Sequence, residues 1–303
     1  MSDLSVSFCG LDFQNPVFTA SGTFSANGSG KFYDYSRLGA VTAKSVSISP
    51  WTGNPLPRIA ETRSGMLNAI GLENPGAEHF ITEELPQIRK GIGSSGTKVI
   101  ASIAGHSLDE YIQAAERLNA EDIDMLELNI SCPNISEGTS FGTNQFLAAK
   151  VTGAVRRVVT KPLIVKLTPN VTDIAEIALA AEAAGADAIS LINTLTGMRI
   201  DVKNRCYLLA NRTGGLSGPG IMPVAIRMTH QAARAVKLPI IGMGGIMSGE
   251  DAMEFLMAGA SAVAVGMAAL VDPTAPVRIL EEMETLMEEY GFADVESIKT
   301  ALR

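Results

Sequence analysis

The chain has few cysteines, and the three that it has lie far apart. They are Cys9, Cys132 and Cys206, in a sequence of 303 residues. An odd number at these spacings provides neither a disulfide framework nor a C-x-x-C metal pair. An iron–sulfur cluster needs four thiolates. The sequence therefore excludes a disulfide scaffold and an iron–sulfur cluster of its own, and we expect no metal site.

Positive charge is also scarce. Lys and Arg number 24 against 32 Asp and Glu, which gives a net charge of −8, and the sequence pI is near 5.0. A nucleic-acid binder neutralises phosphates with an excess of basic side chains. We therefore expect no nucleic-acid partner, and any anionic ligand must be bound by a few local groups.

Long apolar runs, leader sequences and linkers are missing too. The longest uncharged apolar run, Ala262 to Val271, is shorter than the roughly 20 residues that cross a bilayer. The first basic residue is Lys31, so the start resembles neither a signal peptide nor a transit peptide. No Pro/Ser-rich or low-complexity stretch divides the chain. We expect a cytoplasmic protein without a membrane segment, folded as one domain over residues 1–303.

Eight short β-branched runs recur at intervals that leave room for a helix between them. Amphipathic segments such as Asp109–Leu118 and Ile174–Ala184 lie in these intervals. Eight such units favour a TIM (β/α)8 barrel over an open doubly wound sheet. The predicted strands are Pro16–Ala20, Ala40–Lys44, Lys98–Ile103, Met125–Ile130, Leu163–Leu167, Ala188–Ile192, Pro239–Met243 and Ala262–Val265.

Two connections, 45–97 and 194–238, are much longer than the others. Each follows a predicted strand, and the loops after barrel strands build the active site, so we expect long insertions that cap the C-terminal face. The first contains Gly91–Gly96, which fits G-x-G-x-x-G but precedes a strand instead of following one. It is therefore predicted to be a loop and not a dinucleotide site.

Four predicted strands end in polar residues, namely Lys44, Asn129, Lys166 and Asn193. Two lysines and two amides on one rim favour a pocket for a planar, anionic ligand over ordinary solvated side chains. Cys132 follows the fourth strand within Asn129-Ile-Ser-Cys-Pro-Asn134. It is either a buried small hydrophobe or an active-site group, and the flanking asparagines favour the second.

Glycines follow the seventh and eighth strands, in Gly242–Ala252 and Ala258–Met267. Glycines there let backbone N–H groups approach a phosphate, which belongs either to FMN or to a substrate; the alternative is that they serve only as turns. Ser248 with Asp251 predicts a capping box at the next helix. The glycine-containing stretch 133–144 is either a lid over the pocket or an ordinary surface loop.

Eight motifs together resemble the class 1 dihydroorotate dehydrogenases, flavin barrels, over nearly the whole chain. Cys132 resembles the soluble class, since the membrane-associated class has a serine there. The opening and the Arg58–Asn68 region resemble the NAD-linked, heteromeric subclass more than the fumarate-using homodimeric one. The motifs are Thr19–Gly22, Ala43–Ser45, Leu67–Gly76, Asn129–Asn134, Val165–Thr168, Ile192–Thr194, Gly214–Gly218 and Met243–Ile246.

This resemblance implies which residues bind FMN and substrate. Ser102 and Met267 depart from the family pattern, where asparagine and threonine are common, and both changes are expected to weaken FMN contacts without abolishing them. The implied FMN-binding residues are Ser21, Lys44, Ser45, Ser102, Asn129, Lys166, Ile192, Gly218, Gly244, Gly245, Gly266 and Met267. The implied substrate-binding residues are Lys44, Asn68, Ala69, Ile70, Gly71, Leu72, Asn129, Asn134, Asn193 and Thr194.

The resemblance also implies the reaction and the partners. Dihydroorotate is oxidised to orotate in pyrimidine biosynthesis, with Cys132 as base, Lys166 against the reduced flavin and Lys44 against the substrate carboxylate. Electrons are expected to reach NAD through a partner subunit with FAD and an iron–sulfur cluster, in a heterotetramer built around a dimer of barrels. Alternatives are the fumarate-dependent homodimeric enzyme, a flavin barrel of the dihydropyrimidine dehydrogenase kind, a dihydrouridine synthase and a non-catalytic scaffold. The net charge of −8 disfavours the synthase.

Overall fold

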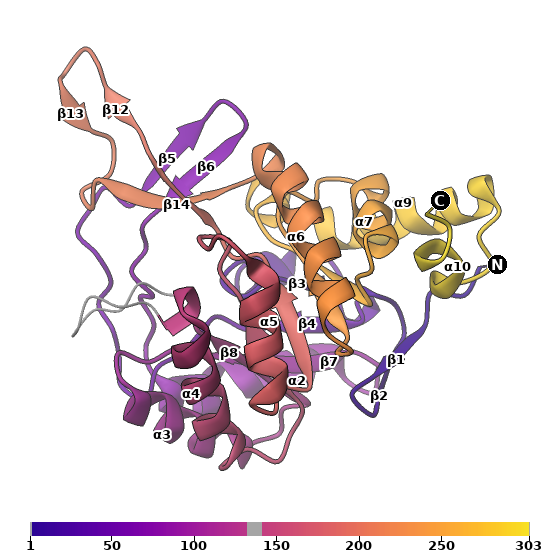
Figure 1. Cartoon of the computed structure of the whole chain (residues 1–303). Coiled ribbons are helices and arrows are strands. Elements are labelled where there is room, and N and C mark those ends of the chain that lie inside the picture. The colour runs from indigo at the N-terminus through magenta and orange to yellow at the C-terminus, as the bar shows by residue number, and fades with distance from the viewer. Residues whose placement is uncertain (1, 132–140, 303) are drawn as a thin grey trace.

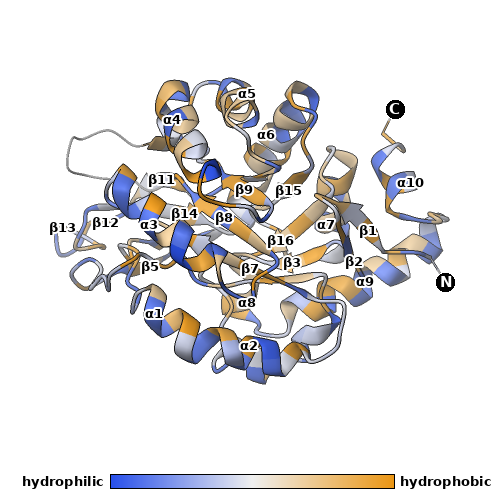
Figure 2. Cartoon of the chain, turned by 90° about the horizontal axis from the view of Figure 1, so that it is seen from below, coloured by the Kyte–Doolittle hydropathy of each residue, from blue (hydrophilic) through white to orange (hydrophobic). Residues whose placement is uncertain are grey.

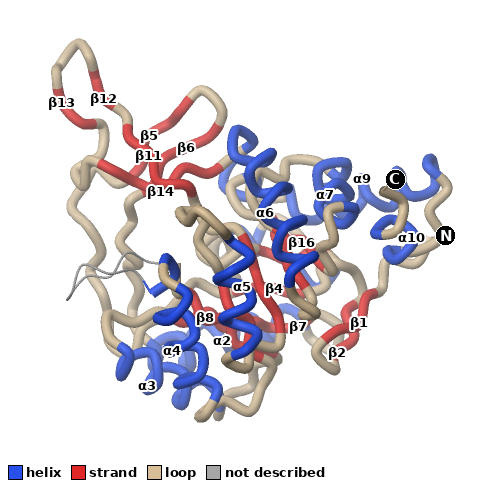
Figure 3. Tube along the Cα trace, viewed as in Figure 1, coloured by secondary structure: helices blue, strands red, loops and turns tan. Residues whose placement is uncertain are grey.

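Eight parallel strands close into a barrel in the computed structural model, which describes residues 2–131 and 141–302. Figures 1 and 3 show these strands inside a ring of helices. All eight predicted strands are present, so the TIM barrel is confirmed. In barrel order the strands are β3 (Val17–Thr19), β4 (Ala40–Thr42), β7 (Lys98–Ile103), β8 (Met125–Asn129), β9 (Leu163–Lys166), β10 (Ala188–Leu191), β15 (Ile240–Gly242) and β16 (Ala262–Val265).

Helices cover the outside of the barrel, as the view along it shows (Figure 2). The predicted capping box of Ser248 and Asp251 opens α7. Gly91 and Ile92 end α2, so the prediction of a loop was wrong for these two residues, whereas residues 93–96 form the loop before β7 and the motif precedes a strand as predicted. The helices are α1 (Ala77–His79), α2 (Leu85–Ile92), α3 (Leu108–Asn119), α4 (Gln145–Arg156), α5 (Ile174–Ala183), α6 (Met222–Ala235), α7 (Gly249–Met257), α8 (Ala268–Val271), α9 (Ala275–Tyr290) and α10 (Val295–Lys299).

The lower half of the barrel interior is apolar and closed at its floor. Phe18 of β3 packs in a tilted orientation against Phe13, with 5.1 Å between ring centroids, and Phe13 stacks on Phe8 at 4.5 Å. Phe8 and Phe13 belong to the hairpin of β1 (Val6–Phe8) and β2 (Leu11–Phe13), which precedes the first barrel strand. These rings pack at the N-terminal end of the barrel strands, and ligands of this fold bind at the opposite, C-terminal end.

The two long insertions come together in one antiparallel sheet, which we call the cap sheet. Its strand order is β11-β14-β6-β5, and β14 of the second insertion pairs with β6 of the first. The insertions leave from the ends of β4 and β10, and the prediction of a cap is therefore confirmed (Figure 1). The strands are β5 (Ile59–Thr62), β6 (Gly65–Asn68), β11 (Leu195–Met198) and β14 (Thr213–Ser217), with a projecting hairpin of β12 (Ile200–Asp201) and β13 (Cys206–Tyr207).

No helix among residues 2–131 and 141–302 is both long enough and apolar enough to span a membrane. The same residues contain no cluster of three His, Cys, Asp or Glu side chains that could hold a metal ion. The N-terminal segment is joined to the C-terminal region by a β-bridge between Asp3 and Asp294.

Candidate active site

A polar layer crosses the barrel above its apolar floor. Glu127 of β8 accepts hydrogen bonds from Ser102 Oγ of β7 at 2.9 Å and from Ser190 Oγ of β10 at 3.0 Å. Lys166 Nζ of β9 lies 3.7 Å from Glu127 Oε1, and both side chains are about 95% buried. The hydroxyl of Ser102 is also hydrogen-bonded to the hydroxyl of Ser45, with 2.8 Å between the two oxygens. A paired charge with several hydrogen bonds is the form in which a carboxylate tolerates burial.

The next layer, toward the open end, is made of amides and hydroxyls. Asn129 donates through Nδ2 to Ser45 Oγ at 3.2 Å. Its Oδ1 accepts from the Ser131 hydroxyl, which in turn accepts from Asn193 Nδ2. Tyr111 of α3 donates to the Asn129 carbonyl at 2.8 Å and holds the end of β8 in place. The strand-end amides predicted to share one rim are therefore brought together in a single network.

The two lysines occupy different parts of this rim. Lys166 Nζ donates to Ser21 Oγ at 3.3 Å, which links β9 to the loop after β3. The Lys44 side chain runs beside Gly22, whose missing Cβ would lie 3.5 Å from Lys44 Cδ and 3.8 Å from Nζ. Both lysines thus approach the Ser21–Gly22 turn, one from inside the barrel and one from its edge.

The predicted phosphate-site residues form a second cluster. Gly218, Gly244 and Gly245 have positive φ values of 111°, 127° and 91°. A Cβ on Gly245 would lie 2.9 Å from the Gly218 carbonyl oxygen, and one on Gly218 would lie 3.0 Å from Met267 Sδ. A Cβ on Gly244 would approach Ile192 Cγ1 at 3.1 Å. Loops after β15 and β16 and the start of short α8 meet here, the customary phosphate position of this fold.

The predicted substrate loop, residues 68–72, is held by the first insertion. Asn54 donates from its backbone to the Ile70 carbonyl at 3.1 Å and from its side chain to the Ala69 carbonyl at 3.0 Å. Asn68 lies on β6 beside Gly215 of β14. A Cβ on Gly215 would collide with Thr194 Oγ1, so Thr194 lies directly against the cap sheet. The structure therefore brings the substrate loop and Thr194 to the same side of the barrel.

Two predicted residues, Cys132 and Asn134, lie outside the described residues, as does most of the stretch 133–144. Sequence reasoning missed Glu127 and Ser131. Glu127 could have been predicted as a site residue, because it lies on the same strand face as Asn129 and the burial of a charged side chain without a partner is unfavourable. Ser131 had a weaker signal, since only the fold shows that it bridges Asn129 and Asn193.

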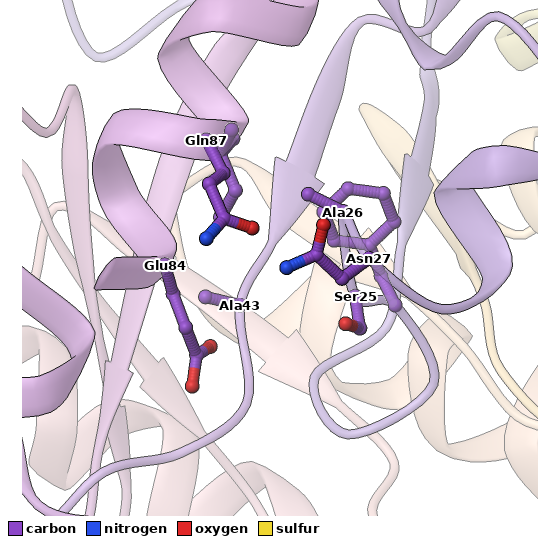
Figure 4. Close-up of a pocket in the computed structure, with 8 residues that line it drawn as sticks. Ser25, Ala26, Asn27, Ala43, Glu84 and Gln87 are labelled. Atoms are coloured by element: carbon purple, nitrogen blue, oxygen red, sulfur yellow. The ribbon is translucent and has the colours of Figure 1, made fainter.

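Two hollows lie in the described part of the chain, and neither is lined by residues of this network. One, of about 30 Å³, lies beside the end of β4 between α2 and residues 24–27 (Figure 4), and has room for about one water molecule. Burial raises the pKa of its Glu84 carboxyl. A wider hollow of about 270 Å³ lies on the cap sheet around residues 62–64 and 197–199. The candidate site is therefore defined by the strand-end side chains and not by these hollows.

Comparison with known proteins agrees with this geometry. A family model described as dihydroorotate dehydrogenase matches residues 3–287. A protein of Lachnoclostridium phytofermentans, named dihydroorotate dehydrogenase B (NAD(+)), catalytic subunit, is 52% identical over 97% of both chains. Proteins of the same name from Alkaliphilus metalliredigens (52% identical, 99% of both chains) and Alkaliphilus oremlandii (53% identical, 98% of this chain and 97% of the relative) are equally similar.

Proposed function

Because the chain belongs to the dihydroorotate dehydrogenase family, we propose that it is the catalytic subunit of an NAD-linked dihydroorotate dehydrogenase. It oxidises dihydroorotate to orotate in pyrimidine biosynthesis, in the cytoplasm, and residues 1–303 form one FMN-binding domain. The observation that carries the proposal is the continuous polar network from Asn193 through Asn129 to Lys166 at the C-terminal ends of the barrel strands.

The residues present fit FMN. The cluster of Gly218, Gly244 and Gly245 offers backbone N–H groups where this fold binds phosphate. Among the described residues, a Cβ on Gly266 would meet only Ala20 Cβ, at 3.5 Å, so space remains beside the start of α8. Lys166 provides a buried cation and Asn129 an amide, the groups that suit a flavin's pyrimidine edge. Ser102 touches Ser45 and Glu127, and we assign it an indirect part in FMN binding through Ser45.

The chemistry requires a base on one face of the substrate and a hydride acceptor on the other. Bound FMN supplies the hydride acceptor for C6. Cys132 removes the proton from C5, and Lys44 pairs with the substrate carboxylate. Asn68, Asn193 and Asn134 bind the ring's amide and carbonyl groups and hold C6 within reach. The other substrate contacts come from the residue 69–72 loop, which Asn54 fixes in advance, and from Thr194.

Electrons then leave through a second subunit. The sequence's three scattered cysteines cannot ligate a four-thiolate cluster. We assign FAD and an iron–sulfur cluster to a partner electron-transfer subunit, in a heterotetramer around a homodimer of barrels. The name "catalytic subunit" borne by the relatives supports this assignment.

The test begins with purified protein, which should be yellow and release about one FMN per chain and no FAD. Anaerobic mixing with dihydroorotate should bleach the flavin. Cys132→Ala should keep FMN and reduce the bleaching rate by roughly 10²–10⁴, the usual contribution of a positioned base. Cys206→Ala, at an exposed cysteine, is the matched control. Bleaching at the parental rate in Cys132→Ala would assign the proton transfer to another group.

Steady-state assays separate the alternatives. The isolated chain should reduce artificial acceptors with dihydroorotate but reduce NAD negligibly. Brisk NADH formation would remove the need for a partner, and brisk fumarate reduction would indicate the homodimeric subclass. Faster bleaching by dihydrouracil than by dihydroorotate would indicate a different pyrimidine substrate, and colourless protein would indicate a scaffold.

A further inference from the structure

Glu127 is a buried charged group to which the proposed mechanism gives no part. Its residue is 3% exposed, and each carboxylate oxygen has a named contact: Ser102 Oγ and Lys166 Nζ for Oε1, Ser190 Oγ for Oε2. These contacts come from three strands that flank or follow β8 in the barrel. These contacts hold the carboxylate in one position. A residue that only fills space in the core would not need such contacts.

Glu127 in turn fixes Lys166. The Lys166 ammonium has two contacts among the described residues in the polar layer, Glu127 Oε1 at 3.7 Å and Ser21 Oγ at 3.3 Å. Lys166 lies opposite Asn129 in the pairing of β8 and β9. One carboxylate therefore determines both where this cation lies and how much of its positive charge remains for a ligand at the barrel mouth.

We propose that Glu127 is a positioning residue that lowers the reduction potential of the flavin through its ion pair with Lys166. This inference rests on the proposed function, in which Lys166 faces the flavin's pyrimidine edge. Two-electron reduction adds negative charge to that edge, and Lys166 stabilises it. The Glu127 carboxylate offsets part of this stabilisation, so electrons are held less tightly and pass more readily to the next carrier.

Two substitutions have opposite expected effects. Glu127→Gln keeps the shape but removes the negative charge, so the equilibrium constant for two-electron reduction should rise on the order of tenfold, about 30 mV. Ser190→Ala keeps both charges but removes one hydrogen bond to the carboxylate. Without this hydrogen bond, more of the negative charge of the Glu127 carboxylate acts on Lys166, and the reduction potential of the flavin should fall. The measurement is a reductive titration of the FMN-loaded protein against a reference dye.

The control is Thr152→Val in α4, because the Thr152 hydroxyl is buried and lacks a hydrogen-bond partner among the described residues. Its potential should equal that of the parent, and a shift there would overturn the inference. An unchanged or lowered potential in FMN-loaded Glu127→Gln would also overturn it. If Glu127→Gln does not fold, Ser190→Ala decides: a fall supports the inference, and no change or a rise refutes it. Parental protein without flavin would refute the proposed function itself, and this inference with it.

Discussion

Alanine at Gly245 is expected to damage both folding and FMN binding. Gly245 has φ +91°, and a Cβ there would lie 2.7 Å from Met222 Cβ, at the start of α6, and 2.9 Å from the Gly218 carbonyl oxygen. The backbone conformation costs a non-glycine residue about 1–2 kcal/mol. Overpacking adds about 1–3 kcal/mol. The free energy of unfolding should therefore fall by about 2–5 kcal/mol in Gly245→Ala.

Part of this strain is released by moving the loop away from α6, which displaces the N–H groups assigned to the phosphate. Each 1.4 kcal/mol that FMN must spend to restore the loop weakens its binding about tenfold. We therefore expect at least a tenfold higher Kd for FMN. Urea unfolding of the apoprotein gives the stability change, and quenching of FMN fluorescence on titration gives the Kd.

Gly266→Ala is the matched control, because it adds the same methyl group at the neighbouring strand end. Gly266 does not have a positive φ, and in the part of the chain that the structure describes its Cβ would meet only Ala20 Cβ, at an ordinary 3.5 Å. Its stability should lie within about 0.5 kcal/mol of the parent. The reasoning fails if Gly245→Ala is as stable as the parent or if Gly266→Ala is equally destabilised.

Two further predictions concern the cap sheet and a buried thiol. Gly215→Ala should push Thr194 and β14 apart and so raise KM for dihydroorotate while FMN content stays unchanged; an unchanged KM would remove Thr194 from the substrate site. Burial, and next the nearby Asp187 carboxylate, raise the pKa of the Cys9 thiol from 9.0 to about 12, so at pH 8 a thiol reagent should label exposed Cys206 well before Cys9. Since the folded state holds this proton more tightly, the thiol's contribution to stability is complete below about pH 9 and is lost as the pH rises toward 12; Cys9→Ala should lack this loss in urea unfolding.

The barrel could be predicted from the sequence because each strand carries its own local signal. β8 shows this, since Leu126 and Leu128 join the helix-facing core while Met125 joins the interior cluster. The position of the cap followed from insertion length alone. Its strand pairing could not be predicted, because Leu67 and Leu216 pair although about half of the chain separates them, and neither insertion alone specifies its partner.

The site was predictable where residue type was unusual for its position. Lys166 and Asn129 end apolar strands, and both lie in the network. The hydrogen bonds that Glu127 accepts come from Ser102 and Ser190, on strands to either side of β8 in the barrel order, and such cross-strand contacts leave no local pattern. Sequence reasoning therefore predicted that Asn129 and Asn193 lie on one rim, but not that Ser131 links them.

The cap sheet also affects the order in which the protein folds. Asn68 Nδ2 and the Gly215 carbonyl oxygen are 3.4 Å apart although 147 positions separate the two residues. Contacts of such long range form late, because the closure of a long loop must be compensated by structure already present. During synthesis, the barrel strands β3 to β10 emerge from the ribosome before β14 does. The cap sheet is thus completed only after most of the barrel exists, and a chain interrupted before residue 213 has the barrel strands β3 to β10 but lacks β14.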